Sequence, residues 1–88
     1  MKVIRLRRPS KHYVSFDFLS VQDLKGLTFT AEKDVIHLNI DHKKRGNLHF
    51  TTHKGTIEDL QLLNFRWKQF QTNEAIFFDL AWFEPSAK

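Results

Sequence analysis

The amino-acid sequence predicts an α+β fold, built as a mostly antiparallel five- to six-stranded sheet with one main helix near the C-terminus. Short stretches in which apolar and polar residues alternate recur along the first part of the chain, as in half-buried strands. Residues 34–53 have the pattern of a hairpin, and the apolar residues after Thr56 change to helical spacing. Strands followed by a separate helix are typical of the α+β class.

Length and composition predict one globular domain, residues 1–88. Hydrophobic residues make up 41% and aromatic residues 14%, so large rings are expected to supply much of the core. The absence of cysteine excludes disulfides and thiolate metal sites. No apolar run approaches the roughly 20 residues that cross a bilayer, and the charged start is unlike a signal peptide. We therefore expect a cytoplasmic protein that does not enter a membrane.

The first part of the chain predicts three strands. Residues 2–8 form the first, which Pro9 ends or kinks, and residues 12–20 alternate over their whole length. The two faces of this second strand carry Val14, Phe16 and Phe18 on one side, and Tyr13, Ser15, Asp17 and Leu19 on the other. Residues 21–26 form a connection with room for one helical turn, and residues 27–31 alternate again.

Residues 34–53 predict a hairpin whose apolar residues share one face. A three-residue loop at residues 44–46 sets Ile40 opposite Phe50 and gives Gly46 the left-handed conformation that such loops favour. The solvent-exposed tip is then expected to carry three basic residues, Lys43, Lys44 and Arg45.

Histidines on the polar face of this hairpin are the candidate metal ligands. The register sets His37 opposite His53 and Asp41 opposite His49, at cross-strand distances of about 5 Å. Catalytic zinc usually takes three protein ligands, whereas each of these pairs supplies two. The sequence therefore predicts a polar strand face, with no metal and no cofactor.

A helix is predicted to begin after Thr56, whose hydroxyl and the carboxylate of Asp59 have the spacing of a capping box. The apolar residues with helical spacing are Ile57, Leu60, Leu63, Trp67 and Phe70. Leu62 and Phe65 fall on the opposite side, which leaves a second interpretation open. In that interpretation the helix ends early and residues 65–70 form a strand paired with the final one.

The final strand, residues 74–84, is predicted to be apolar on both faces. One face carries Ile76, Phe78, Leu80 and Trp82, and the other carries Ala75, Phe77, Ala81 and Phe83. Such a strand either runs through the centre of a sheet or meets a partner, because exposure of both faces invites aggregation. Phe77, Phe83 and Trp82 are therefore candidate residues of a partner interface.

The distribution of charge favours a nucleic-acid partner, either DNA or RNA. The net charge is +4, and the first twelve residues carry five basic side chains and no acid. The candidate phosphate contacts are Arg5, Arg7, Arg8, Lys11, Lys43, Lys44, Arg45, Lys54, Arg66 and Lys68. Tyr13, Phe65 or Trp67 would add a stacking face if exposed. The N-terminal segment and the hairpin tip can act together only if they share a surface.

No spacing of residues predicts catalysis. The chain lacks a nucleophile elbow and a glycine-rich phosphate loop, and a substrate pocket would use much of so small a core. We therefore expect a non-enzymatic binding module with no small-molecule substrate. The alternative is a protein-binding regulator, inhibitor or assembly subunit that uses the apolar final strand, with a homodimer as one form of such an assembly.

Overall fold

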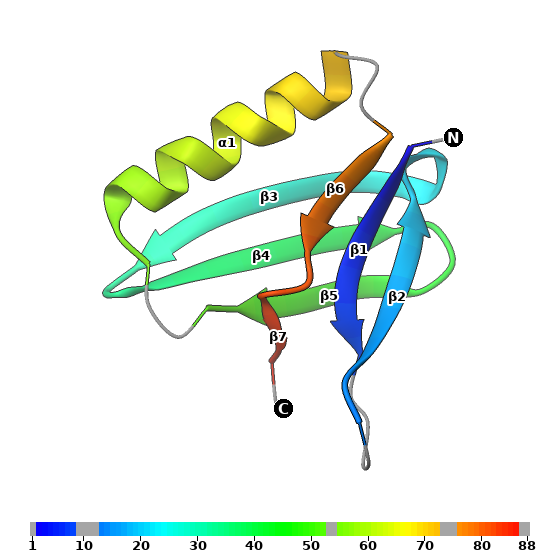
Figure 1. The fold of residues 1–88 in the computed structure, drawn as a ribbon, viewed down its shortest axis with the longest axis horizontal. Helices are drawn as coiled ribbons and strands as arrows, with labels where there is room; N and C mark the ends of the chain where they lie inside the picture. The colour runs from blue at the N-terminus through cyan, green and yellow to red at the C-terminus, as the bar shows by residue number, and fades with distance from the viewer. Residues whose placement is uncertain (1, 9–12, 53–54, 73–75, 87–88) are drawn as a thin grey trace.

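The computed structural model describes residues 2–8, 13–52, 55–72 and 76–86 of the chain. The predicted α+β class is confirmed, with seven strands and one α-helix among these residues (Figure 1). The strands are β1 (Val3–Arg8), β2 (Ser15–Ser20), β3 (Leu24–Glu32), β4 (Val35–His42), β5 (Gly46–Thr51), β6 (Phe77–Leu80) and β7 (Glu84–Pro85). The helix is α1 (Ile57–Thr72), and a short 3-10 helix, Val21–Asp23, forms the turn expected between β2 and β3.

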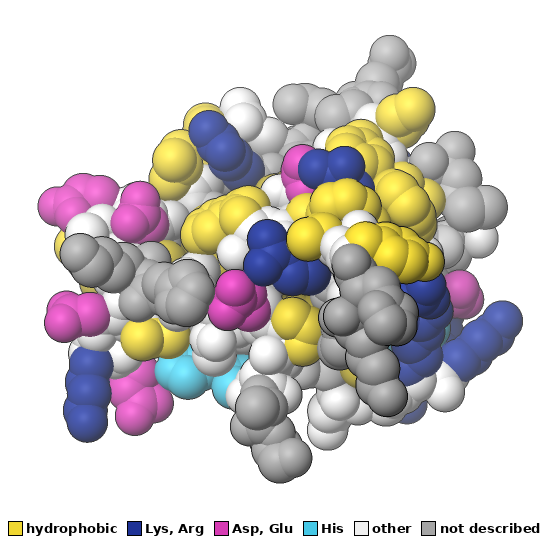
Figure 2. Space-filling model, turned by 60° about the horizontal axis from the view of Figure 1, so that its bottom comes forward, with side chains coloured by type: hydrophobic (Ala, Val, Ile, Leu, Met, Phe, Trp, Pro, Cys, Tyr) yellow, Lys and Arg dark blue, Asp and Glu magenta, His cyan; other side chains and the backbone are white. Residues whose placement is uncertain are grey.

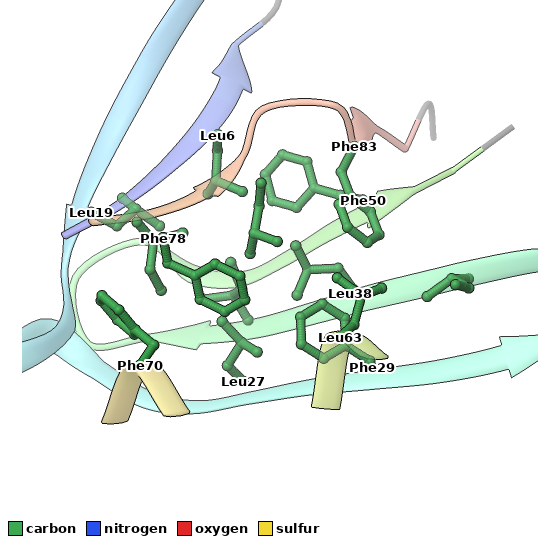
Figure 3. Close-up of a cluster of buried hydrophobic side chains, with 14 residues drawn as sticks. Leu6, Leu19, Leu27, Phe29, Leu38, Phe50, Leu63, Phe70, Phe78 and Phe83 are labelled. Carbon is green, nitrogen blue, oxygen red and sulfur yellow. The ribbon is translucent and has the colours of Figure 1, made fainter. Parts of the chain in front are cut away.

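The strands form two sheets instead of one. The first has the order β2-β1-β6 and the second the order β3-β4-β5-β7. The β1–β6 pair is parallel, whereas the other pairs are antiparallel. Side chains from both sheets and from α1 point into one core between them (Figure 3). That core includes five phenylalanines, namely Phe29, Phe50, Phe70, Phe78 and Phe83.

The β4–β5 hairpin has the predicted faces but a register shifted by two residues. Ile40 lies opposite Leu48 instead of Phe50, and the loop is residues 43–45 instead of 44–46. A two-residue shift keeps every side chain on its face, because the side-chain period of a strand is two. The buried ring of His42 favours this loop, since its Nδ1 accepts the backbone amides of residues 44 and 45, each at 3.1 Å.

Gly46 follows the loop with the predicted left-handed backbone, at φ +76°. The shifted register changes the histidine contacts, because His37 lies opposite Thr51 and Asp41 lies opposite Asn47. The expected pairing of Asp41 with His49 is therefore wrong, and His53 lies outside the described residues.

His37 instead contacts His49 diagonally across the hairpin. The distance from His37 Nδ1 to His49 Nε2 is 2.8 Å, and the two ring planes are parallel to within 3°. One nitrogen must donate and the other accept, so the pair holds one shared hydrogen.

The long-helix interpretation is confirmed, and the strand at residues 65–70 does not form. The Thr56 hydroxyl accepts the amide of Asp59 at 3.1 Å, and the Asp59 carboxylate accepts the amide of Thr56 at 3.0 Å. This capping box satisfies donors that the first turn leaves open. Leu63 and Phe70 enter the core, whereas Ile57 and Phe65 are exposed.

The C-terminal end of α1 is also closed. Lys2 Nζ donates to the carbonyls of Phe70, at 2.6 Å, and Gln71, at 3.0 Å. A cation at this end of a helix also suits the helix dipole. One of the N-terminal basic residues therefore has a structural partner.

The predicted final strand, residues 74–84, is broken within its length. The Asp79 carboxylate accepts the amide of Ala81 at 2.9 Å, and the chain turns before β7 begins. The turn reverses the alternation, so Trp82 is exposed and Phe83 is fully buried. The prediction that Trp82 shares a face with the buried residues of β6 is wrong, and both short strands lie at sheet edges.

Strand β2 turns its aromatic face outward. Leu19 lies in the core opposite Ile4, whereas Phe16 and Phe18 are exposed. Asp17 shares the inward face with Leu19 but lies nearer the edge, where it remains partly exposed. The expectation that the aromatic residues mostly fill the core therefore does not hold for this strand.

Gly55 is packed against the core, and substitution by alanine should destabilise the fold. A Cβ at this position would lie 2.4 Å from Ile36 Cγ1, in a side chain that is fully buried. We expect Gly55→Ala to lower the free energy of unfolding by about 1–3 kcal/mol, measured by urea denaturation. Gly26→Ala is the matched control, because its Cβ would meet nothing within 4 Å. Equal urea midpoints for the two variants would contradict the tight packing of Gly55.

Candidate nucleic-acid interface

Basic side chains from two distant parts of the chain line one cleft, named here the basic cleft. It has a volume of ≈ 380 Å³ and is lined by residues of β1, β2, the β4–β5 hairpin and β7. Its polar lining is Arg7, Arg8, Asp17, Arg45, Asn47, His49 and Ser86, and its apolar lining is Leu6, Leu48, Phe50 and Pro85. The N-terminal basic segment and the hairpin tip thus share a surface, although nothing in the local sequence joins them.

An ion pair fixes the hairpin tip to β2. Both terminal nitrogens of the Arg45 guanidinium donate to the Asp17 carboxylate. The hydrogen bond from Arg45 is the main reason that the pKa of Asp17 lies below its ordinary value of 3.8, although partial burial acts in the opposite direction. The amide of Lys43 also donates to the carbonyl of Asp23 at 2.8 Å. The tip is therefore held in place at two points.

The two arginines at the end of β1 differ in their partners. Arg7 Nη1 donates to a carboxylate oxygen of Glu84 at 3.1 Å, whereas Arg7 Nε is buried without an acceptor among the described residues. Arg8 is exposed and has no ion-pair partner in residues 2–8, 13–52, 55–72 and 76–86. The basic cleft thus combines two arginines positioned by acids with one that is not.

The other predicted phosphate contacts are divided between the tip and the helix. Lys43 and Lys44 are exposed beside Arg45. Arg66 and Lys68 are exposed on α1, which contributes no residue to the basic cleft. The remaining two candidates in this group, Lys11 and Lys54, lie outside the described residues.

Arg5 lies outside the cleft, on the solvent side of the β2-β1-β6 sheet. This surface, named here the outer face, consists of Arg5, Phe16, Phe18, Phe77 and Asp79. Hydrophobic side chains gather with basic and acidic ones in this region of the molecule (Figure 2). Arg5 Nε and Nη2 donate to the two carboxylate oxygens of Asp79, at 3.1 and 2.7 Å.

Asp79 keeps its charge through these contacts. Partial burial acts to raise the pKa of Asp79, but hydrogen bonds from Arg5 and from the amide of Ala81 outweigh it. The net effect places the pKa below the ordinary value, so the carboxylate stays ionised and holds the guanidinium in a fixed plane.

The three candidate interface residues do not form one surface strip. Phe77 lies on the outer face with 44% of its area exposed, and Trp82 is 50% exposed in the turn after β6. Phe83 is 0% exposed and packs against Phe29, with ring centroids 6.0 Å apart. Phe83 therefore belongs to the core and is not available to a partner.

Several residues of these surfaces were missed by the sequence analysis. Asp17 and Glu84 pair with arginines that are remote in the chain, so no local spacing indicates them. The alternation of residues in β2 indicated that Phe16 and Phe18 lie on the opposite face of the strand from Leu19. The alternation alone did not indicate which of the two faces is buried.

A second hollow lies over β3, β4 and β5 and has a volume of ≈ 590 Å³. It meets the basic cleft at Asn47, Leu48 and His49, which line both. Its lining includes Asp41 and contains no lysine or arginine. A polyanion therefore suits the basic cleft and not this hollow.

The Asp17–Arg45 pair predicts a component of stability that is lost in acid. A carboxyl whose pKa is lowered by folding stabilises the folded state at pH values above its unfolded pKa, and this contribution disappears as the pH falls through the folded pKa. We expect Asp17→Asn to be less stable than the parent by about 0.5–1 kcal/mol near neutral pH, because the pair is partly exposed. The difference should shrink as the pH falls below 3.8, measured by urea denaturation at several pH values.

Asp41→Asn is the matched control for this series, since Asp41 is exposed and has no ion-pair partner among the described residues. A difference between the parent and Asp17→Asn that stays constant down to about pH 2.5 would contradict the role of the Asp17 carboxylate.

Comparison with known protein families, with curated proteins and with solved structures finds no match for this chain. Within the described ranges, no three or more histidine, aspartate or glutamate side chains are grouped so as to hold a metal ion. None of the described helices has the length and apolar character that crossing a bilayer requires.

Proposed function

We propose that this protein is a non-enzymatic nucleic-acid-binding module whose basic cleft holds the phosphate backbone. The observation that carries the proposal is the meeting of Arg7 and Arg8, from β1, with Arg45, from the β4–β5 tip, around one cleft. Guanidinium groups bind phosphate oxygens in a bidentate manner, and clustered cations supply most of the affinity for nucleic acid.

The ion pairs of the cleft are compatible with phosphate binding. Exposed pairs contribute only about 0–1 kcal/mol to stability, so a phosphate can compete for the same donors. Asp17 and Glu84 meanwhile orient the guanidinium groups of Arg45 and Arg7 before a ligand arrives. Positioning in advance reduces the entropy that binding must remove from flexible side chains.

Exposed lysines extend the positive surface beyond the cleft. Lys43 and Lys44 are exposed at the hairpin tip, next to Arg45 in the sequence. The tip itself is fixed to β2 through the ion pair of Arg45 with Asp17. Arg8 makes no salt bridge among the described residues, although its charge also acts on Asp17. These three side chains are the ones whose removal tests the proposal without breaking an ion pair.

A protein-binding role for the final strand is the less favoured proposal. Its expected surface combined Phe77, Trp82 and Phe83, and the last of these is fully buried. Trp82 lies in the turn after β6, whereas Phe77 lies on the outer face. The two exposed residues therefore do not form one continuous surface for a partner.

The triple variant Arg8→Gln/Lys43→Gln/Lys44→Gln should bind nucleic acid more weakly and with less dependence on salt. Each phosphate contact contributes about 0.7–0.9 to the slope of log K against log salt concentration, so the magnitude of the slope should fall by about 2–3. Fluorescence anisotropy with labelled DNA and RNA at about 50 and 200 mM salt measures both effects.

Lys33→Gln is the control for this experiment, because it removes a positive charge from the turn between β3 and β4, remote from the cleft lining. We expect this variant to bind like the parent at both salt concentrations. Absence of binding by the parent at the lower salt concentration would contradict the proposal, as would an equal loss per removed charge in the control.

A further inference from the structure

The outer face exposes three phenylalanine rings that the fold does not use in its core. Phe16 is 38%, Phe18 is 55% and Phe77 is 44% exposed. Phe16 and Phe18 lie on β2 and Phe77 lies on β6, and the rings of Phe18 and Phe77 approach each other across β1. The inward side of the same strands is filled by other residues, among them Leu19 and Phe78. A contiguous group of exposed rings marks an interaction site more often than scattered apolar residues do.

Arg5 lies among these rings as a second flat group. Its guanidinium carbon is 4.4 Å from the centroid of Phe16 and 5.8 Å from that of Phe77. The two hydrogen bonds to Asp79 fix the guanidinium plane and neutralise its charge locally. The centre of the outer face is therefore aromatic and nearly neutral, which suits planar groups and not phosphates.

Positive charge lies at the edge of this aromatic region. Arg7 is two residues from Arg5 on the same strand, lies opposite Phe16, and lines the basic cleft. A ligand that reached from the outer face to the basic cleft would meet rings at one end and cations at the other. Planar bases carried on a phosphate backbone have this combination of chemistry.

The spacing of the rings favours bases that are not stacked on one another. The centroids of Phe18 and Phe77 are 6.2 Å apart, with the ring planes tilted by 40°. Bases in a duplex are separated by about 3.4 Å and turn their faces to each other, so they cannot cover two such rings. Unpaired bases can be spread apart and laid on aromatic side chains and arginine planes.

We propose that the outer face is a stacking surface for unpaired bases, and hence that the ligand of this protein is single-stranded nucleic acid. This inference rests on the proposed function, since the basic cleft supplies the phosphate contacts. The rings of Phe16, Phe18 and Phe77 stack bases, and the Arg5 plane, held by Asp79, fills the space between them.

The test compares a labelled oligothymidine of about 12 nucleotides with a labelled duplex of the same length, a span suited to the site sizes of single-strand binders. The variants are Phe18→Leu and Phe77→Leu, which keep an apolar side chain and remove the ring. Phe65→Leu is the matched control: Phe65, a stacking candidate from the sequence, is exposed at 57% but lies on α1, which contributes no residue to the basic cleft or to the outer face.

Three results are expected together. The parent binds the single strand more tightly than the duplex, Phe18→Leu and Phe77→Leu each bind the single strand at least about 5-fold more weakly, and Phe65→Leu binds like the parent. The salt dependence of all three variants should match that of the parent, since no charge has changed. Urea midpoints close to the parent's confirm that the variants fold.

Other results overturn the inference. Equal affinity for single strand and duplex does so, as does equal binding by Phe18→Leu, Phe77→Leu and Phe65→Leu. A dimer in sedimentation that Phe18→Leu dissociates shows that the outer face holds a second copy of the chain instead. If neither nucleic acid binds at about 50 mM salt, the proposed function itself fails, and this outcome is distinct from the others.

Discussion

The carboxylate of Asp79 is the group on which both the connection of the two sheets and the order of the outer face depend. It accepts two hydrogen bonds from Arg5 and one from the amide of Ala81. The contact with Ala81 turns the chain out of β6, and this turn carries Phe83 into the core and begins β7 in the second sheet. The contacts with Arg5 hold its guanidinium among the exposed rings. The path of the chain after β6 and the position of Arg5 on the outer face thus depend on the same ionised side chain.

The local features of the fold were predictable, whereas the features made by remote pairs were not. Alternation located the strands, and the spacing of Thr56 and Asp59 located the beginning of α1. The hairpin register was wrong by two residues because the ring of His42 accepts loop amides, and turn statistics do not include such a contact. The break of the final strand depends on Asp79, whose partner Arg5 is 74 residues away.

The candidate site followed the same division. The basic residues were visible in the sequence, but their partners were not, so the charge count overstated the cations that are free to meet phosphate. Lys2 closes the end of α1, and Arg5, Arg7 and Arg45 pair with acids. The face of β2 that is buried could not be chosen from alternation, because Asp17 shares the inward side with Leu19 and is accommodated by an arginine from the hairpin tip. Several basic side chains of this protein therefore stabilise the fold, and a smaller number remain at the surface without an acidic partner among the described residues.

The parallel pairing of β1 with β6 has a consequence for how the chain folds. Arg5 and Asp79 are separated by 74 positions, so β1 becomes the middle strand of its sheet only when β6, which lies far away in the sequence, pairs with it. Contacts between residues so far apart raise the contact order and slow folding relative to helical proteins of the same size. The β3–β4–β5 meander contains only sequential antiparallel pairs, which require much shorter loop closures. The meander and the β1–β2 hairpin, which is also a sequential antiparallel pair, are therefore expected to form early, and β6 joins β1 last. The outer face, which needs Phe77 and Asp79 of β6, comes into existence only at that final step.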